Sequence, residues 1–349
     1  MPADSSVPQP ASRNRTWLIL TVLVLLAALV WFLRGRIHFD WATLGRQLRF
    51  VSITRVLIAI LLTYICYWIR ALRWSVLLSP VTKLSANALF PAQAIGFTSV
   101  ALFGRVADLA RPYLIARRAK TPVATQLAIY SVERAFDLGA AAVLFSVTLA
   151  LAPRNMPHHS AFARAGVVSM GATLFLVVFA IALRFAGDKL ARLAARLLHP
   201  LSQRFAEAAH ARILDFHDGF RTVSSLGEFA LALLLSLVMW TGIAFVYVES
   251  AHAFQASPEL ATLSFSATML LLATGIGGSL LQLPVIGWFT QIAVLAAALH
   301  GFFGVPLETA TACGAIILLT TNLCIIPGGA IAARLQGIAL NSTVVSFKF

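Results

Sequence analysis

Charged residues are scarce in this sequence: Asp, Glu, Lys and Arg together make up only 11% of its 349 residues. A soluble domain carries about 25% of such residues, so the composition excludes an ordinary soluble protein. Hydrophobic residues reach 59% and fall in long apolar runs. We therefore expect an all-α protein, a polytopic helical bundle in a membrane.

Among the charged residues, acidic ones are the rarer: 13 Asp and Glu stand against 27 Lys and Arg, which gives a net charge of +14. Such an excess could indicate a nucleic-acid partner, but no basic helix or aromatic-interleaved groove accompanies it. Basic residues scattered between apolar spans are typical of cytoplasmic membrane loops. We therefore expect no nucleic-acid partner, and a multi-pass protein of the bacterial plasma (inner) membrane with both termini cytoplasmic.

Cysteine is also sparse. Cys66, Cys313 and Cys324 all lie in apolar segments and lack metal-ligand spacing, so we interpret them as packing residues. A cluster of polar residues, His210, Asp215, His217 and Asp218, does not have the spacing of a metal-binding motif either. The sequence therefore predicts no metal site and no cofactor.

Eight apolar runs predict membrane spans: 17–33, 56–78, 123–152, 166–183, 229–248, 263–283, 289–303 and 307–326. Arg13 and Arg15 precede the first run as in a signal peptide, but the missing small-residue cleavage site favours an uncleaved span. The Pro327-Gly328-Gly329 triplet is expected to end the last span.

The domain organisation follows from these runs. We expect residues 1–16 to form a disordered tail. Residues 17–338 are expected to form one transmembrane domain, and residues 339–349 a C-terminal tail. Residues 184–226 read as an amphipathic segment on the cytoplasmic face. Residues 34–54 are also amphipathic, and we interpret them as an interfacial helix on the outer leaflet. That position disagrees with the positive-inside rule for five arginines: Arg34, Arg36, Arg46, Arg49 and Arg55.

Two apolar segments are interrupted by glycine and proline. The run 86–103 is short and broken by Pro91, Gly96 and Gly104, which predicts a re-entrant hairpin. A second broken segment, 275–287, occupies a comparable place in the other half of the chain. Paired breaks of this kind are typical of inverted-repeat transporters, although glycines in membrane helices also serve close packing.

Charged residues concentrate inside the apolar part of the chain. Glu133 and Asp137 lie four residues apart, so they share a helix face, and Arg134 lies three residues before Asp137 and can pair with it. Only about 22 Å of helix follows, from residue 138 to 152, which is less than a hydrocarbon core of about 30 Å. The charges must therefore lie in the core or at its edge. Such residues are functional by default; the alternative is a salt bridge that only joins two helices.

Arginines precede this segment. Arg70 and Arg73 share a helix face near the end of a span, where they either snorkel to the interface or hold an anionic headgroup. Arg105, Asp108 and Arg111 follow the first broken segment.

At these residues the sequence resembles a known family. Three elements carry the resemblance: Arg70-Ala71-Leu72-Arg73-Trp74, then Gly104-Arg105-x-x-Asp108-x-x-Arg111, then Glu133-Arg134-x-x-Asp137. In this order they look like the flippase-like membrane domain of lysylphosphatidylglycerol synthases, over residues 16–338. The resemblance implies a lipid-handling membrane domain, without the aminoacyltransferase domain that gives the family its name.

The sequence departs from the family pattern at two places. Ala107 and Asp108 stand where the family has Gly-Glu. Gln291 stands after the second broken segment, where the family has Glu, which argues against a proton-coupled or cation-binding role for that segment.

Three functions were weighed. The first is a translocase for an anionic phospholipid or polyprenyl-phosphate intermediate, whose headgroup enters a cavity lined by Arg70, Arg73, Arg105 and Arg111 and binds their planar guanidinium groups. The second, a membrane transferase, lacks a nucleophile–base pair or metal ligands, so we expect no enzyme. The third is a non-transporting membrane partner; association with such a partner or with a second copy stays open. For the first function, the expected lipid-binding residues are Arg70, Arg73, Arg105, Asp108, Arg111, Glu133, Arg134, Asp137 and Gln291.

Overall fold

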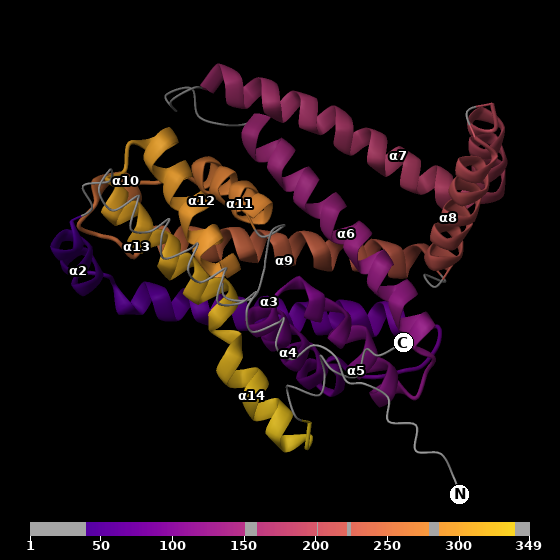
Figure 1. Ribbon diagram of the computed structural model, residues 1–349, viewed down its shortest axis with the longest axis horizontal. Coiled ribbons are helices and arrows are strands. Elements are labelled where there is room, and N and C mark those ends of the chain that lie inside the picture. Colours follow the sequence, from indigo (N-terminus) through magenta and orange to yellow (C-terminus); the bar gives the residue numbers. More distant parts are fainter. Residues whose placement is uncertain (1–39, 151–158, 201, 222–224, 279–285, 339–349) are drawn as a thin grey trace, which may run out of the picture.

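The computed structural model describes residues 40–150, 159–200, 202–221, 225–278 and 286–338, and every regular element within them is helical. The predicted tails (1–16 and 339–349), the first predicted span (17–33) and the turn around Pro284 lie outside these residues. Figure 1 shows the elements, which are α2 (Trp41–Arg49), α3 (Ile53–Leu78), α4 (Ala86–Phe103), η1 (Arg105–Leu109), α5 (Ala110–Ala119), α6 (Val123–Ala150), α7 (His159–Leu198), α8 (Gln203–Arg221), α9 (Leu226–His252), α10 (Pro258–Ala261), α11 (Phe265–Gly278), α12 (Ile286–Phe303), α13 (Leu307–Leu318), η3 (Leu319–Leu323) and α14 (Ile325–Leu335).

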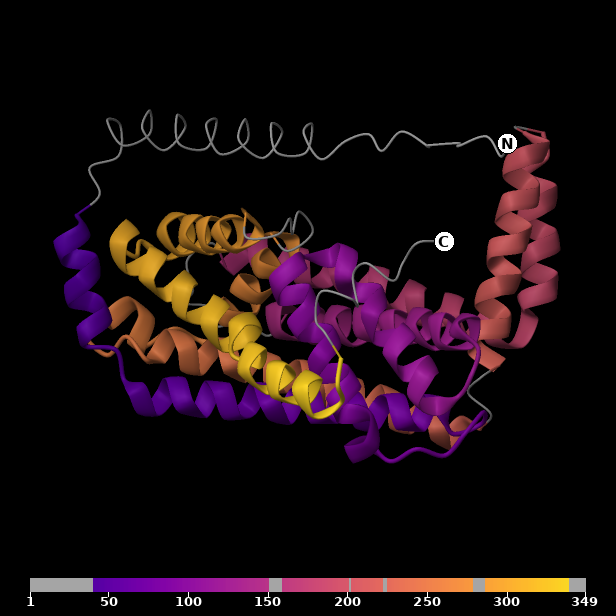
Figure 2. The same cartoon turned by 60° about the horizontal axis from the view of Figure 1, so that its bottom comes forward.

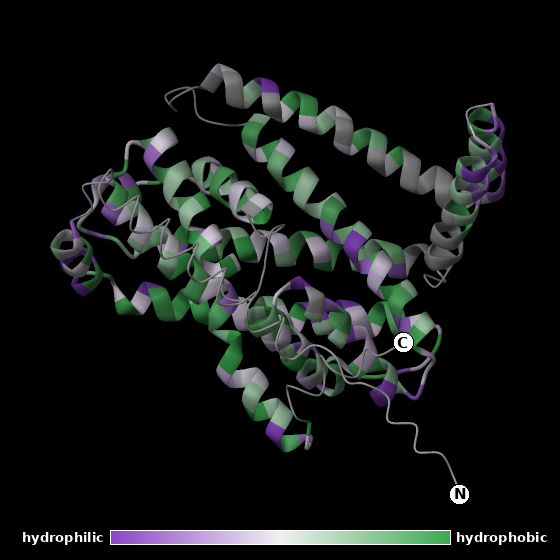
Figure 3. Ribbon diagram, in the orientation of Figure 1, coloured by the Kyte–Doolittle hydropathy of each residue, from purple (hydrophilic) through white to green (hydrophobic). Residues whose placement is uncertain are grey.

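Within the described residues, five helical units are long and apolar enough to cross a membrane: α3, α4, α9, α12 and the continuous unit Leu307–Leu335. Hydrophobic residues cover most of these helices in Figure 3, while a hydrophilic patch interrupts α6 part of the way along its length. The prediction of an all-α membrane protein is confirmed; the number of eight spans stays a prediction. All three cysteines are free and buried.

Helices α3 and α9 pack against each other along their lengths and run in opposite directions. The Ser52 amide, just before α3, donates to the Ala253 carbonyl just after α9, at 2.8 Å. At the other end, the Ser79 hydroxyl donates to Glu228 near the start of α9, at 3.0 Å. These two helices therefore form an antiparallel pair at the centre of the bundle.

The first broken segment forms one limb of a hairpin with a single turn, and its re-entrant placement in a membrane stays a prediction. Helix α4 continues through Pro91 and Gly96, so the interpretation of these two residues as breaks is wrong. Gly96 is needed for packing, because a Cβ there would lie 2.0 Å from Cγ of Arg111. The chain reverses at Gly104, whose φ of 75° favours glycine, and returns as η1 and α5.

The hairpin begins and ends near the C-terminal end of α3: its first limb starts there, and the chain returns there after its second limb. The Ser75 hydroxyl donates to the Leu84 carbonyl just before α4. The Trp74 indole donates to Gln126 near the start of α6, at 3.0 Å. The chain therefore enters and leaves on one side of the bundle, as a re-entrant hairpin does.

The start of α12, which follows the second broken segment, lies beside the last turn of α4. Helix α11 runs on to Gly278, and the next described residues begin α12. Near the start of α12, the Trp288 indole donates to the Ala101 carbonyl in the last turn of α4, at 2.9 Å. The helices that precede the two broken segments in the chain, α3 and α9, run antiparallel. The inverted repeat itself stays a prediction.

The last helical unit does not end where the sequence predicted. Pro327, Gly328 and Gly329 lie inside α14, which continues to Leu335. A π turn, η3, precedes the proline, and such turns accommodate a residue that cannot donate a backbone hydrogen bond. The expectation that Pro327 closes the last span is therefore wrong.

Side chains from α3 and α4 satisfy backbone carbonyls around this π turn. Hydroxyl groups donate to the carbonyls of Thr320, Thr321, Cys324 and Ile325, at distances of 2.8, 3.2, 2.9 and 3.1 Å; the donors are Thr63, Tyr67, Tyr64 and Thr98. In a bilayer an irregular backbone needs such partners, because no water is present to replace them.

Replacing Thr98 by valine is expected to destabilise the protein by about 0.6 to 2 kcal/mol, the range for hydrogen bonds between membrane helices. The isosteric change leaves the Ile325 carbonyl without its donor. Thr311→Val is the control, because the Thr311 hydroxyl donates only within its own helix, to Leu307 at 2.7 Å. Unfolding in detergent measures both; equal losses would contradict a role for the Thr98 contact between helices.

Amphipathic elements cover the two ends of the bundle. Figure 2 shows α2 at one end, crossing the direction of α3, and α8 with the part of α7 after its kink at the opposite end, also crossing it. Helix α7 turns at Ala186, where the backbone leaves helical geometry (φ −135°, ψ 26°). The Asp40 carboxylate caps α2, and hydrogen bonds from Thr43 and Ala42 lower its pKa. The predicted amphipathic segments thus lie at the two ends of the bundle, and their position at membrane surfaces stays a prediction.

Candidate functional site

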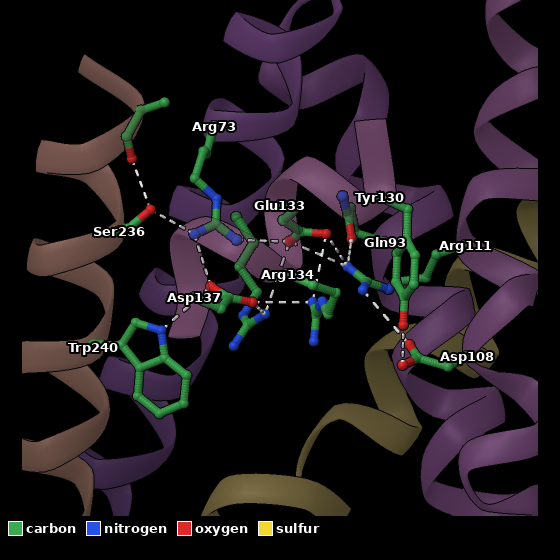
Figure 4. Close-up of polar contacts among 12 residues, drawn as sticks. Arg73, Gln93, Asp108, Arg111, Tyr130, Glu133, Arg134, Asp137, Ser236 and Trp240 are labelled. Atoms are coloured by element: carbon green, nitrogen blue, oxygen red, sulfur yellow. Dashed lines mark hydrogen bonds and ion pairs between the residues drawn. The ribbon is translucent and has the colours of Figure 1, made fainter. Parts of the chain in front are cut away.

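The charged residues of the apolar part meet in one buried network. Helix α3 supplies Arg70 and Arg73, η1 and α5 supply Asp108 and Arg111, and α6 supplies Glu133, Arg134 and Asp137. Figure 4 labels all of these side chains except Arg70 and shows them converging on one another. All nine residues expected from the sequence either belong to this network or line the cavity beside it; Gln291 belongs to the cavity lining.

Glu133 is the centre of the network. Its carboxylate is fully buried and faces four guanidinium groups: Arg73 at 2.8 Å, Arg111 at 3.2 Å, Arg134 at 3.4 Å and Arg70 at 3.9 Å. A buried carboxylate is stable only when it is paired and hydrogen-bonded. Glu133 therefore connects α6 to both α3 and α5.

Asp137, one helical turn further along α6, shares three of these partners. It lies 2.8 Å from Arg73, 3.1 Å from Arg134 and 3.5 Å from Arg70. The pairing of Arg134 with Asp137 that the spacing predicted is therefore present. Arg73 makes the short contact to both carboxylates, whereas Arg70 and Arg134 are held at longer distances.

Arg111 and Asp108 form the side of the network next to the hairpin. Arg111 donates to Gln93 at 3.1 Å and to Glu133 at 3.2 Å, and its second terminal nitrogen lies 3.5 Å from Asp108. Asp108 also accepts a hydrogen bond from the Tyr130 hydroxyl at 2.5 Å. The hairpin is thus attached to α6 by charged and polar contacts.

Four polar side chains that the sequence analysis did not single out complete the network: Gln93, Tyr130, Ser236 and Trp240. Ser236 accepts from Arg73 at 2.6 Å, and the Trp240 indole donates to Asp137 at 3.3 Å. Both lie on α9, far away in sequence, and a lone serine or tryptophan in an apolar run carries no signal of such a role.

A cavity of about 230 Å³ opens beside the network. Arg70, Arg105, Asp108 and Arg134 line one part of it. The side chains of Arg70 and Arg134 keep exposed fractions of 11% and 36%.

The other two arginines lie behind the cavity. Arg73 and Arg111 are fully buried and do not belong to its lining. The four arginines expected to line a cavity (Arg70, Arg73, Arg105 and Arg111) are therefore divided into a cavity-lining pair, Arg70 and Arg105, and a pair that holds the carboxylates from behind.

Positive charge exceeds negative charge in this network. Four arginines face three carboxylates, and arginine stays protonated in proteins. Four buried nitrogens have neither a hydrogen-bond acceptor nor an ion-pair contact among the described residues: Nε of Arg73, Arg111 and Arg134, and Nε2 of Gln93. The network therefore has unused donors and a net positive charge, a combination suited to an anion.

Gln291 lies on α12 at the opposite part of the cavity. It is buried and accepts a hydrogen bond from Asn322 of the π turn at 3.0 Å. Asn322 itself was not singled out from the sequence. Among the described residues, no three His, Cys, Asp or Glu side chains lie close enough together to hold a metal ion.

This architecture defines an all-α, multi-pass membrane protein with a buried ion network at a cavity between two hairpins. The chain belongs to the family described as the lysylphosphatidylglycerol synthase TM region, whose model matches residues 18–328. Membership in this family connects the chain with the handling of membrane lipids. Comparisons with curated proteins and with solved structures returned no match.

Proposed function

We propose that this protein binds the headgroup of an anionic lipid, a phospholipid or a polyprenyl-phosphate intermediate, and moves it across the bilayer. One observation carries the proposal: the buried network has excess positive charge and presents Arg70 and Arg134 to a cavity at the meeting point of two hairpins. Buried charge of this kind in a membrane protein marks a substrate pathway by default. The proposal assigns no catalytic step to the chain.

The two groups of arginines suggest how a headgroup would be exchanged. Arg73 and Arg111 keep Glu133 compensated from behind, at 2.8 and 3.2 Å. Arg134 and Arg70, which contact the carboxylates at longer distances, are then able to turn toward a phosphate without leaving a buried carboxylate unpaired. Phosphate and carboxylate would thus compete for the same two guanidinium groups, and the competition makes binding reversible, as transport requires.

We propose an orientation in which the α7–α8 end of the bundle is cytoplasmic and α2 lies on the outer face. Basic residues near the first end favour it under the positive-inside rule; they are Lys83, Arg117, Arg118, Lys120, Lys189, Arg192, Arg196 and Arg204. At the other end, local carboxylates offset two of the five discordant arginines: Arg55 lies 2.9 Å from Glu249, and Arg46 lies 3.8 Å from Asp40.

Neutralising a cavity-lining arginine is expected to slow lipid movement at least about tenfold, because one charge-assisted hydrogen bond is worth ~1.5–3 kcal/mol. The variants are Arg70→Gln and Arg134→Gln. Proteoliposomes containing fluorescent phosphatidylglycerol or a labelled polyprenyl phosphate, with an impermeant quencher outside, measure the rate.

The matched control is Arg204→Gln, which removes an exposed arginine on α8, away from the cavity. Its rate is expected to equal that of the wild type. If the wild type moves neither lipid, or if the cavity variants move both lipids at the wild-type rate while remaining folded, the transport proposal is wrong.

A further inference from the structure

Three aromatic rings surround Arg111, the buried arginine that joins the hairpin to Glu133. Its guanidinium carbon lies 4.4 Å from the ring centroid of Phe97, 5.3 Å from that of Tyr130 and 5.5 Å from that of Trp74. A cation within about 6 Å of a ring centroid is attracted by the negative face of the ring. Rings from α3, α4 and α6 therefore form an aromatic cage that the protein's own guanidinium fills. Figure 4 shows the Tyr130 side chain beside Arg111.

Two of these rings also contact an arginine of the cavity. The Phe97 ring centroid lies 5.3 Å from the guanidinium carbon of Arg70, and that of Tyr130 lies 5.1 Å from the guanidinium carbon of Arg134. Arg70, Arg134 and Phe97 all line the cavity. Each of the two rings is therefore shared between the buried Arg111 and one cavity-lining arginine.

The arginines that contact these rings are the ones that the carboxylates hold at longer distances. The nearest carboxylate oxygens lie 3.1 Å from Arg134, 3.2 Å from Arg111 and 3.5 Å from Arg70, whereas Arg73 lies 2.8 Å from both of its carboxylates. Nε of Arg111 and Nε of Arg134 also have neither an acceptor nor an ion-pair contact among the described residues. A buried cation needs compensation, and a ring provides part of it without a hydrogen bond.

An aromatic ring holds an arginine without occupying its hydrogen-bond donors. The attraction acts through the face of the ring, whereas the five N–H groups of a guanidinium lie in its plane and point outward. A carboxylate, by contrast, holds an arginine by accepting from those same N–H groups. A ring can therefore fix the position of Arg70 or Arg134 while the N–H groups of that arginine remain available to an anion in the cavity.

We propose that Phe97 and Tyr130 are positioning residues for anion binding. Each ring, anchored on Arg111, holds one arginine at the cavity: Phe97 holds Arg70, and Tyr130 holds Arg134. The inference rests on the proposed function and extends its site to two uncharged residues. Donors that are already held in place bind more tightly than mobile ones, because less conformational entropy is lost on binding. Weakening the face of either ring is therefore expected to weaken anion binding, although the charges of the network stay unchanged.

A series of fluorinated phenylalanines in place of Phe97 tests the role of the ring face. Fluorine withdraws electron density from the face and changes the size of the ring little, so the attraction for a cation falls with each added fluorine. Full-length protein carrying phenylalanine, or its mono-, di- or trifluoro analogue introduced by amber suppression, is purified in detergent. Native mass spectrometry measures the binding of short-chain phosphatidylglycerol and of polyprenyl phosphate, the two lipid classes of the proposed function.

Affinity is expected to fall stepwise along the Phe97 series, by about tenfold between phenylalanine and the trifluoro analogue, because this ring contacts two guanidinium groups. The same series in place of Phe245 is the matched control. The Phe245 ring packs against Phe265, at 5.5 Å between the ring centroids, and does not belong to the cavity lining. Fluorination there is expected to leave the affinity at the wild-type value.

Two variants isolate the contribution of the Tyr130 ring. Tyr130→Phe and Tyr130→Leu both remove the hydroxyl that donates to Asp108, so the difference between them reports the ring alone. Tyr130→Leu is expected to bind lipid about tenfold more weakly than Tyr130→Phe. Unfolding in detergent shows whether each variant is folded, and the Phe97 series decides the matter even if Tyr130→Leu is not.

Equal affinity along the Phe97 series would overturn the inference, and so would an equal fall along the Phe245 series. A fall in thermal stability along the Phe97 series without a fall in affinity would also overturn it, since the ring would then serve the fold alone. A stepwise fall in affinity without movement in proteoliposomes would refute the transport proposal and leave this inference standing. Movement by proteins whose affinity does not respond to fluorination would do the reverse, and a wild type that binds neither lipid would overturn both.

Discussion

Glu133→Gln is expected to destabilise the protein by about 3–5 kcal/mol, the cost of removing one partner from a buried ion pair. Arg73 and Arg111 contact the Glu133 carboxylate at 2.8 and 3.2 Å and are fully buried. After the change, Arg111 retains only Asp108, at 3.5 Å, as a charged partner. Chemical or thermal unfolding in detergent measures the loss.

The same chemical change at a partly exposed pair provides the control. Glu249 pairs with Arg55 at 2.9 Å, with side-chain exposed fractions of 20% and 37%. Glu249→Gln is expected to cost no more than about 1 kcal/mol, because solvent screens such pairs. Adding Arg111→Met to Glu133→Gln is expected to recover part of the loss, since it removes a buried cation whose remaining charged partner, Asp108, lies at 3.5 Å. If Glu133→Gln and Glu249→Gln cost the same, the network does not stabilise the fold in the way described.

Gly329→Ala is expected to separate α14 from α4, to destabilise the protein by about 1–3 kcal/mol and to stop lipid movement. A Cβ at this position would lie 1.9 Å from the Thr98 hydroxyl oxygen and 2.6 Å from the Ala94 carbonyl oxygen. The Ala94 carbonyl belongs to the α4 backbone and cannot rotate away. The helices must therefore move apart, which also breaks the bond from Thr98 to the Ile325 carbonyl.

Gly301→Ala is the matched control for this change. Gly301 lies in α12 and is exposed, and a Cβ there would meet nothing within 4 Å. Alanine is the better helix former by about 1 kcal/mol, so this variant is expected to be as stable as the wild type or slightly more stable. Unfolding and proteoliposome assays on both variants give the comparison. Wild-type stability for Gly329→Ala would show that close contact between α4 and α14 is not required.

Several features followed from local sequence alone. The membrane class follows from the apolar runs, because burial of such runs in lipid does not depend on how the helices pack. The contact between Arg134 and Asp137 at 3.1 Å follows from their spacing, since residues three apart are neighbours on any α-helix. The reversal at Gly104 follows similarly, because glycine favours the positive φ that the turn adopts.

Other features followed only from contacts between distant segments. Pro91 and Pro327 were read as interruptions, yet both lie inside helices. Around Pro327, hydroxyl groups of α3 and α4 donate to the carbonyls of Cys324 and Ile325, which helps the helix to continue. Gly96 and Gly329 mark places where a second helix comes close. A local pattern contains no information about which helix that is.

The sequence by itself thus determined that this protein is a membrane helical bundle with charged residues in its apolar part and two broken segments. Only the tertiary structure decided that Arg73 lies behind the cavity lining and donates to Ser236. It also decided that Arg134 and Gln291, which are far apart in the sequence, line the same cavity. Helical spacing determines which residues share a face of one helix. Which face is buried, and against which partner, depends on how helices that are distant in the chain cross.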